Sequence, residues 1–225
     1  LPFAGIARAA FIAMQFLNSL VNLKIISVEE RGLFLNSLDT VTKRLSLDVK
    51  KLSAGEITVD EFLKTYGHLR PGTYDILSES YEENFNRYFD SDAKRGKKNM
   101  ETVAGFKFSP DKIDKIDALM EKHGLNIGAE NLFNFIKEAT EGREHAKFIF
   151  TRNVDRILKL IKDYGHRIDL SPDDMSFTEI GTLMKLHSTV ASLDEEKEIR
   201  TEIDRNRVRH EFYKHIKLPH LICDP

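Results

Sequence analysis

The residue types best suited to chemistry gather in one short segment, residues 66–75, which reads Tyr-Gly-His-Leu-Arg-Pro-Gly-Thr-Tyr-Asp. An imidazole ordinarily titrates near neutral pH, so the side-chain type of His68 can relay a proton or accept a phosphoryl group. Alternatively, it follows the end of a helix, bonds free carbonyl groups there and packs against Tyr66 or Tyr74. Gly and Pro keep this segment out of helical geometry, so we expect an ordered loop.

Three further side chains of this loop are candidates for binding a ligand. Arg70 can grip a phosphate or carboxylate with its planar fork, or it can pair with Asp75 and pin the loop. The Tyr74 ring can stack on a ligand or fasten the loop to the helices. Tyr74 and Asp75 are too few to make a metal site, and we expect no metal. The sequence thus predicts a substrate-binding loop that contains His68, Arg70, Tyr74 and Asp75.

A second group of charged residues begins at Arg143. Arg143, Glu144 and His145 open a predicted helix, and Arg152 and Arg156 lie further along it. The group can line an anion pocket to which Arg143 contributes. It can equally form a network of salt bridges on the helix surface.

Two other basic stretches also have two interpretations. Residues 94–98 read Lys-Arg-Gly-Lys-Lys and can touch a phosphate or nucleic acid, although such clusters are usually solvated loops. Arg205, Arg207, Arg209 and His210 form a stripe on the last predicted helix that can dock another domain or face solvent. The formal net charge of −2 provides no global basic field, so we expect no nucleic-acid partner.

Composition bounds the class of protein. The chain of 225 residues is 41% hydrophobic and can fill a core. Cys223 is the only cysteine, which excludes an internal disulfide and a Cys-based metal site and fits the reducing cytoplasm. Residues 1–23 are apolar but interrupted by Arg8, Gln15 and Asn18, so we expect a buried amphipathic helix and no membrane partner. The chain begins Leu-Pro without Met, and we expect it to be an excised piece of a longer protein.

Helix signals recur along the chain, and alternating strand patterns are nearly absent. Capping boxes at Ser27–Glu30 and Thr58–Glu61 predict two helix starts, the first for a helix that continues to Gly55. Two further helices are expected over residues 129–140 and from about 142 to 164. These patterns predict an all-α, multi-helix bundle with an ordered Gly/Pro loop.

The chain shows one shift in composition. Residues 90–105 are charged and lack periodicity. We expect a single helical domain over residues 1–225, with candidate sub-bundles at 1–90 and 106–218 and a linker at about 91–105.

Familiar catalytic motifs do not occur in the sequence. There is no Walker loop, no GxGxxG after a strand, no HExxH, no GxSxG and no EF-hand loop. We therefore expect this piece by itself to be non-catalytic.

The chain resembles the helical region of phosphoenolpyruvate-utilising enzymes of the phosphoenolpyruvate synthase and rifampin phosphotransferase type, and this loop is the first segment that carries the resemblance. In that family a Tyr-Gly-His-Arg-Gly-type loop follows a helix similar to residues 61–65, Glu-Phe-Leu-Lys-Thr. Residues 66–72 look like that loop with Leu69 inserted. The family's next segment, of Ser-Pro-Arg-Tyr/Trp type, has lost its Pro and Arg here, since residues 78–83 read Ser-Glu-Ser-Tyr-Glu-Glu, so no role of that Arg is carried over.

Three later segments are similar to the same family. They are the Arg143-Glu144 helix, the Asp-rich step at 170–177, and the Arg-rich helix with Leu-Pro at 205–219. In the family an ATP-grasp domain carries out the phosphoryl donor chemistry, and a small swivelling domain carries the phosphorylated His. A helical domain lies between or beside these two domains.

The resemblance implies that this chain is a non-catalytic helical linker and acceptor-binding domain. Its intramolecular partners would be the ATP-grasp and phosphohistidine domains, and its ligand a small-molecule acceptor. The parent would be a phosphotransferase, a kinase-type transferase that uses ATP and Mg, with no cofactor bound by this piece. His68 would not be the phosphorylated His. Two alternatives stay open: a helical bundle that holds an apolar small molecule among some of its 15 Phe residues, or a scaffold that binds only protein.

Overall fold

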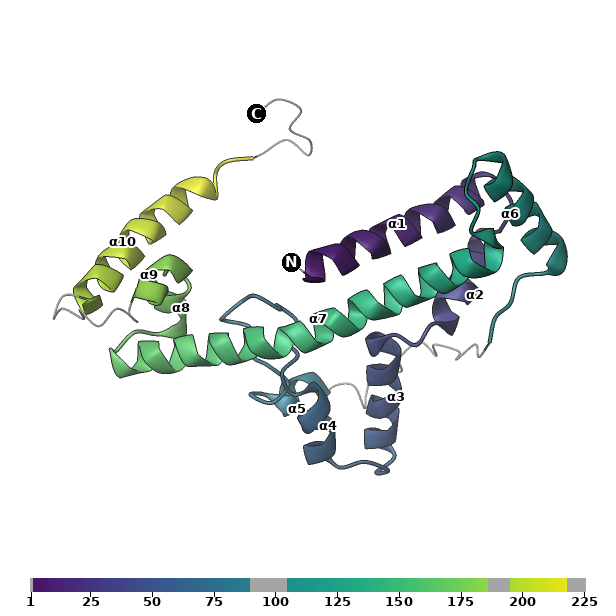
Figure 1. Ribbon diagram of the computed structural model, residues 1–225. Helices are drawn as coiled ribbons and strands as arrows, with labels where there is room; N and C mark the ends of the chain where they lie inside the picture. Colours follow the sequence, from purple (N-terminus) through teal and green to yellow (C-terminus); the bar gives the residue numbers. More distant parts are fainter. Residues whose placement is uncertain (1, 90–104, 186–194, 218–225) are drawn as a thin grey trace. The chain divides into compact units, whose positions relative to one another are not determined.

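The computed structural model describes residues 2–89, 105–185 and 195–217, and within these ranges it contains ten α-helices and no strand (Figure 1). The prediction of an all-α, multi-helix fold is therefore confirmed. The helices are α1 (Pro2–Asn22), α2 (Val28–Ser37), α3 (Val41–Ser53), α4 (Val59–Tyr66), α5 (Phe85–Phe89), α6 (Pro110–Lys122), α7 (Gly128–Arg167), α8 (Pro172–Met175), α9 (Ile180–Lys185) and α10 (Glu195–Tyr213). The basic cluster at 94–98, nearly all of the predicted linker at 91–105, and Cys223 lie outside the described residues.

Capping boxes begin three of the helices. At α2 the Ser27 hydroxyl accepts from the Glu30 N–H at 3.1 Å, and the Glu30 carboxylate accepts from the Ser27 N–H at 2.8 Å. The boxes at α4 and α8 follow the same pattern. Each box satisfies backbone donors that the first helical turn leaves without a partner. The helix starts predicted at Ser27 and Thr58 are confirmed.

The helix expected from Ser27 to Gly55 is divided in two. Leu38 adopts an extended backbone (ψ 148°) after α2, and the Thr40 hydroxyl caps α3 by accepting from the Lys43 N–H at 3.3 Å. The apolar periodicity continues across this break, which is why the division is not visible in the pattern of apolar residues. An N-cap inside a periodic segment can start a new helix.

The two helices expected on either side of Gly142 are instead one. α7 runs for 40 residues, from Gly128 to Arg167, through both Gly142 and Gly165. A glycine in a helix interior costs only about 1 kcal/mol relative to Ala. Full burial of Leu132 and Ile136 in the first part of α7 outweighs that cost.

The chain divides into two compact units. The first unit contains residues 1–68 and 81–152, and the second contains residues 69–80 and 153–225. This division differs from the expected sub-bundles, because α6 and the first part of α7 pack with the N-terminal helices.

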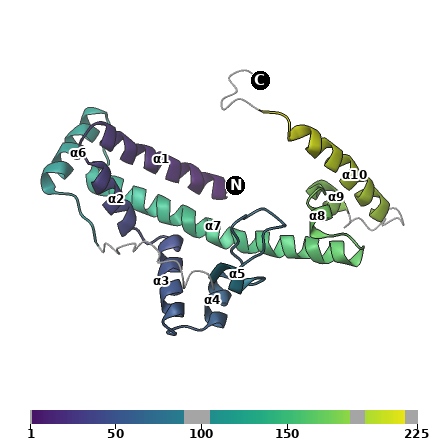
Figure 2. The ribbon, with the colours of Figure 1, turned by 180° about the vertical axis from the view of Figure 1, so that it is seen from behind.

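Each unit has its own apolar core. In the first unit, buried side chains from α1, α2, α6 and α7 form one cluster, and Figures 1 and 2 show α1 alongside the first part of α7. The members of this cluster include Leu17, Phe34, Ile116, Leu132 and Ile136. In the second unit the cluster joins the 69–80 segment to α8 and α10, with Ile76, Leu170, Met175, Ile199 and Ile203.

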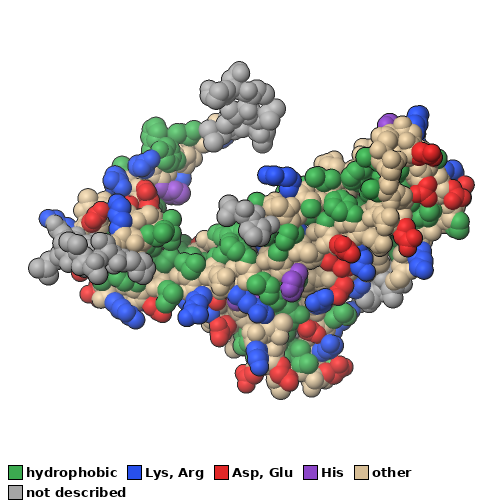
Figure 3. Space-filling view, in the orientation of Figure 1, with side chains coloured by type: hydrophobic (Ala, Val, Ile, Leu, Met, Phe, Trp, Pro, Cys, Tyr) green, Lys and Arg blue, Asp and Glu red, His purple; other side chains and the backbone are tan. Residues whose placement is uncertain are grey.

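α1 is less buried than expected. The structure buries Ala10, Ala13, Leu17 and Leu20, whereas Phe3 and Ile6 are 37% and 36% exposed. Figure 3 shows hydrophobic side chains on the outer surface of this helix. Residues 3–22 are long and apolar enough to cross a membrane, and 22% of the most apolar stretch is buried. Core helices and N-terminal signal sequences share these properties, so the prediction about membranes stays a prediction.

Candidate functional site

The candidate site is the loop between α4 and α5, residues 67–82, which we call the 67–82 loop. Its two ends meet, since the Glu82 N–H donates to the Gly67 carbonyl at 2.9 Å. A Cβ atom on Gly67 would lie 2.4 Å from the Leu63 carbonyl oxygen and 3.2 Å from the Glu82 Cβ. Only glycine therefore allows the chain to leave α4 and return at this point.

His68 contacts the first part of α7. Its Nε2 lies 3.1 Å from the Phe148 carbonyl oxygen, and its ring packs edge-on against the Phe148 ring with centroids 4.8 Å apart. A carbonyl group can only accept, so Nε2 carries the proton in this contact. The expectation that His68 bonds carbonyls at the end of its own helix is corrected, because this carbonyl belongs to α7. The Thr151 hydroxyl donates to the same oxygen at 2.9 Å.

Tyr66 precedes the loop and is 4% exposed. Its hydroxyl donates to the Asp48 carboxylate at 2.8 Å. Burial and this hydrogen bond raise the pKa of Tyr66 far above the ordinary value. The phenol therefore stays neutral and ties α4 to α3.

Arg70 is the buried centre of the loop. Its guanidinium forms an ion pair with Asp155 on α7, and the two side chains are 2% and 8% exposed. Arg70 Nη1 also donates to the Ser78 carbonyl at 2.8 Å, and Lys159 Nζ lies 3.1 Å from the other Asp155 oxygen. Of the two interpretations of Arg70, the contacts agree with the one in which it pins the loop, although its ion pair is with Asp155 and not with Asp75. In this arrangement Arg70 fixes the loop, while anion binding by its guanidinium stays a prediction.

The tip of the loop is closed by Ser78. The Gly72 N–H donates to the Ser78 hydroxyl at 3.0 Å, and a Cβ atom on Gly72 would lie 2.9 Å from the Asp75 Cβ. The Asp75 carboxylate accepts from the Leu77 N–H at 2.8 Å, which is an Asx-turn. Asp75 thus shapes the tip.

Tyr74 lies in this tip with 67% of its surface exposed. The expectation that its ring fastens the loop to the helices is therefore wrong. The other interpretation, that Tyr74 stacks on a ligand, stays a prediction.

Arg143 lies in the first unit, on α7. Its Nη1 donates to the Glu144 carboxylate at 2.9 Å, and its guanidinium lies 5.7 Å from the centre of the Phe11 ring. Arg152, further along α7, lies over the Phe148 ring at 5.1 Å. The Phe11 contact joins α7 to α1, whereas the other two contacts lie within α7. The anion pocket suggested for Arg143 stays a prediction.

The basic stripe of α10 contacts its own unit. Arg207 bridges Asp173 at 2.9 Å and Asp174 at 2.6 Å. Arg205 lies 3.6 Å from Glu202, and Arg209 donates to the Tyr213 hydroxyl at 3.3 Å. The Arg207 contacts help to hold α10 against α8, so this residue is not simply solvated.

Asp155 is the site residue that the sequence does not reveal. It lies 85 residues from Arg70, inside a helix that contains many other charged residues. The only available signal is chemical: a buried arginine needs a carboxylate. That rule predicts that Arg70 has a carboxylate partner, but it does not identify which Asp or Glu that partner is.

The 67–82 loop can therefore present an exposed aromatic ring on a backbone fixed by buried charge and by two glycines. Among the described residues, no group of three or more His, Cys, Asp or Glu side chains is placed to hold a metal ion, and the prediction of no metal stays a prediction. No family model, curated protein or solved structure matches the chain in comparisons with known proteins.

Proposed function

We propose that this chain is the helical domain of a phosphoenolpyruvate synthase-like phosphotransferase of the cytoplasm. In this proposal it positions an ATP-grasp domain and a phosphohistidine domain within a longer protein. ATP and Mg would bind elsewhere in that longer protein and not to this chain. The 67–82 loop helps to bind the phosphoryl acceptor.

The observation that carries the proposal is the fixed geometry of the 67–82 loop. The two glycines of the Tyr-Gly-His-Leu-Arg-Pro-Gly segment occupy places where a Cβ would collide with neighbouring atoms, and its arginine is buried in an ion pair. A loop that is constrained in this way can hold a ligand in one orientation. Phosphoryl transfer depends on such in-line placement more than on covalent chemistry supplied by the protein.

The contacts suggest a division of roles within the proposed site. Tyr74 is the exposed side chain that can contact the acceptor. Arg70 and Asp75 position the loop, through Asp155 and through the Asx-turn. His68 and Arg143 lie in the first unit, and their roles as binding residues stay predictions of their own.

The test needs the protein that contains this chain together with its neighbouring sequence. That sequence should encode an ATP-grasp domain on one side and a phosphohistidine domain on the other. Tyr74→Ala should then lower the rate of phosphoryl transfer to the acceptor and leave ATP-dependent phosphorylation of the histidine unchanged. Tyr213→Ala, which removes another half-exposed tyrosine, is the matched control. Flanking domains of any other kind, or phosphorylation of the isolated chain by ATP, would contradict the proposal.

A further inference from the structure

A separate cavity lies in the first unit and is lined by residues 21 and 23–28 and by Lys112 and Lys115, none of which belongs to the 67–82 loop. It is a shallow cavity, open to solvent, with a volume of about 670 Å³, and it is bordered by the end of α1, the turn at 23–27, Val28 of α2, and α6. This volume is within the range of small-molecule sites, roughly 300–1,000 Å³. None of the residues that line this cavity belongs to the 67–82 loop, so an inference about the cavity does not rest on the function proposed above.

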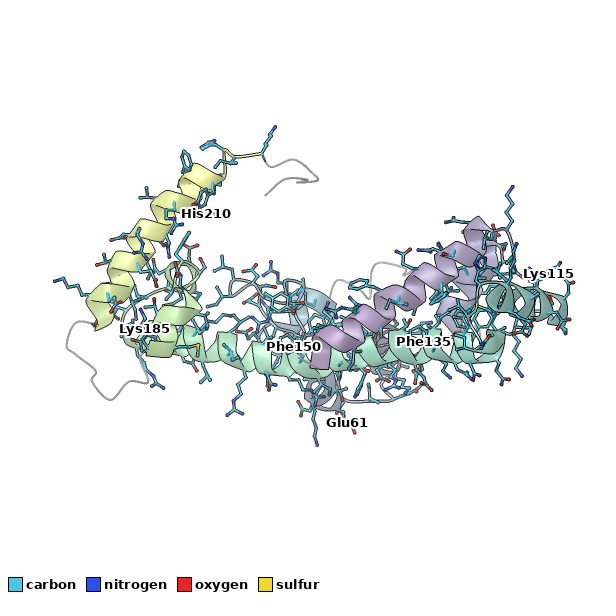
Figure 4. The ribbon with its side chains drawn as sticks, turned by 45° about the horizontal axis from the view of Figure 1, so that its top comes forward. Glu61, Lys115, Phe135, Phe150, Lys185 and His210 are labelled. Atoms are coloured by element: carbon cyan, nitrogen blue, oxygen red, sulfur yellow. The ribbon has the colours of Figure 1, made fainter. Side chains whose placement is uncertain are left out.

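The charged side chains around this cavity are all basic. Lys24, Lys112 and Lys115 line it, and no Asp or Glu from the part of the chain that the structure describes does so. Figure 4 labels Lys115 on α6. Lys112 pairs with Glu30 at 2.5 Å and Lys115 with Asp111 at 2.8 Å, and both of these acids lie outside the lining. The charge that favours an anionic group is therefore carried mainly by Lys24, since Lys112 and Lys115 each have a carboxylate beside them.

Lys24 stands apart from the other two lysines. It makes no ion pair with any residue that the structure describes. Its backbone has a φ of 58°, the left-handed conformation that glycine usually supplies at a helix end. The Ile25 N–H donates to the Leu20 carbonyl at 3.0 Å and fixes this turn. A lysine is thus held at the rim in a conformation that costs lysine more than glycine.

The rest of the lining is apolar. Ile26 is 2% exposed and forms part of the core beneath, while Val21 and Ile25 are half-buried. Leu23 and Val28 are 56% and 57% exposed at the rim. Apolar surface and basic groups therefore border the same space.

We propose that this cavity binds a small, soluble amphipathic anion, a phosphate or carboxylate attached to an aliphatic body. Lys24 and Lys115 would contact the anionic group, and Leu23, Ile25 and Val28 would cover the aliphatic part. The second cavity of the first unit is different, because it is smaller, about 270 Å³, and is bordered by acids as well as bases. Charge complementarity assigns the anion to the first cavity.

Octyl phosphate is the probe that tests this assignment, with binding to the full chain measured by isothermal titration calorimetry. We expect saturable binding at one site, and weaker binding of octyl glucoside, which has the same chain and no charge. Lys24→Gln combined with Lys115→Gln should weaken octyl phosphate binding by roughly tenfold or more, because a hydrogen bond to a charged group contributes about 1.5–3 kcal/mol. Lys122→Gln, which removes an exposed lysine of α6 outside the lining, should leave the affinity unchanged.

A second pair of changes tests the apolar half of the cavity. Leu23→Ser with Val28→Ser should weaken octyl phosphate binding, and because both side chains are exposed, helicity and thermal stability should be retained. Equal affinity for octyl phosphate and octyl glucoside would overturn the proposal. So would no change on removal of the two lysines, or binding only to vesicles of phosphatidylserine and phosphatidylcholine with none to monomeric octyl phosphate.

Discussion

Arg70 and Asp155 form an ion pair between side chains that are 85 residues apart in the sequence and almost completely buried. Two charges removed from water are costly unless each satisfies the other, so the loss of one partner is more damaging than the loss of both. This pair fixes the 67–82 loop against α7 in the second unit.

Breaking this ion pair should destabilise the protein. Asp155→Asn should lower the free energy of unfolding by about 3–5 kcal/mol, since it leaves a buried guanidinium without its carboxylate. Arg70→Met should cost less, because Lys159 remains 3.1 Å from Asp155. Urea denaturation measures both values. The double variant Arg70→Met, Asp155→Leu should recover part of the loss, and a double variant as unstable as the sum of the two single ones would contradict the account.

An exposed ion pair provides the control for that experiment. Arg44 and Asp39 lie 2.5 Å apart with 56% and 58% of their side chains exposed. Arg44→Met should therefore change the free energy of unfolding much less than Asp155→Asn does.

Gly72 should not accept a methyl group. Gly72→Ala would place Cβ 2.9 Å from the Asp75 Cβ and 3.1 Å from the Ser78 Cβ, so the loop tip must shift. We expect a loss of about 1–3 kcal/mol in the free energy of unfolding, measured by thermal or urea denaturation. Gly32→Ala in α2 is the matched control: its Cβ meets nothing within 4 Å, and Ala should stabilise this helix by up to about 1 kcal/mol. Similar changes in the free energy of unfolding for Gly72→Ala and Gly32→Ala would show that the loop tip accommodates a methyl group at Gly72.

The capping box of α8 should make stability depend on acid pH. The Ser171 hydroxyl and N–H donate to the Asp174 carboxylate at 2.5 and 2.7 Å and hold its pKa below the usual range, with Arg207 adding to the effect. This stabilisation is present above the pKa of the unfolded chain, about 3.9, and is lost as the pH falls through the lower pKa of the folded chain. Asp174→Asn should therefore cost about 1 kcal/mol at neutral pH. The difference from the parent chain should narrow below about pH 4.

Urea denaturation at several pH values measures that difference. Asp173→Asn is the control on the same helix, because Asp173 is 63% exposed. Its effect should stay within about 0.5 kcal/mol at every pH. A difference between the parent chain and Asp174→Asn that does not change with acidification would exclude the assigned cause.

Tyr66 should make stability depend on alkaline pH. Burial, and then the hydrogen bond to Asp48, raise its pKa, so the folded chain keeps the neutral phenol. The stabilisation is full below the pKa of an unfolded tyrosine, about 10, and is lost as the pH rises from there toward the higher folded value. Tyr66→Phe should cost about 1–2 kcal/mol at neutral pH through the lost hydrogen bond. Its disadvantage should shrink above about pH 10.

Denaturation at increasing pH, with tyrosinate absorbance as the second readout, checks this expectation. Tyr74→Phe is the control, since its ring is 67% exposed. A Tyr66 hydroxyl that ionises in the folded chain near the ordinary tyrosine pKa would contradict the prediction.

Local signals in the sequence predict much of this fold. The capping boxes at Ser27 and Thr58 predict where α2 and α4 begin, because they involve neighbours three residues apart. The break at Leu38 and the continuity of α7 through Gly142 were not predicted. In both places a local preference competes with packing against other helices, and a pattern along one helix does not contain that packing.

In the candidate site too, features set by neighbouring residues were predictable from the sequence, whereas contacts between distant residues were not. The two glycines and the proline predict an ordered loop, which the contacts at Gly67 and Gly72 bear out. The acid considered as a partner for Arg70, Asp75, is not the acid in the ion pair that the structure shows. Asp75 is near in sequence, but its carboxylate is used by the Leu77 N–H, whereas Asp155 is brought in by tertiary structure.

Ser78 accepts two hydrogen bonds, one on its carbonyl from the Arg70 guanidinium and one on its hydroxyl from the Gly72 N–H. These bonds close a small ring around residues 73–77. Within this ring Tyr74 is exposed, whereas Ile76 is buried in the core of the second unit. The tip therefore offers an attachment point for spectroscopic labelling: with Cys223→Ser removing the chain's single thiol, Tyr74→Cys would carry a fluorophore at a surface position. Natural sequences that keep the ring, Asp75 and the buried Ile76 could likewise exchange Thr73, Tyr74 and Leu77 and acquire different ligand preferences.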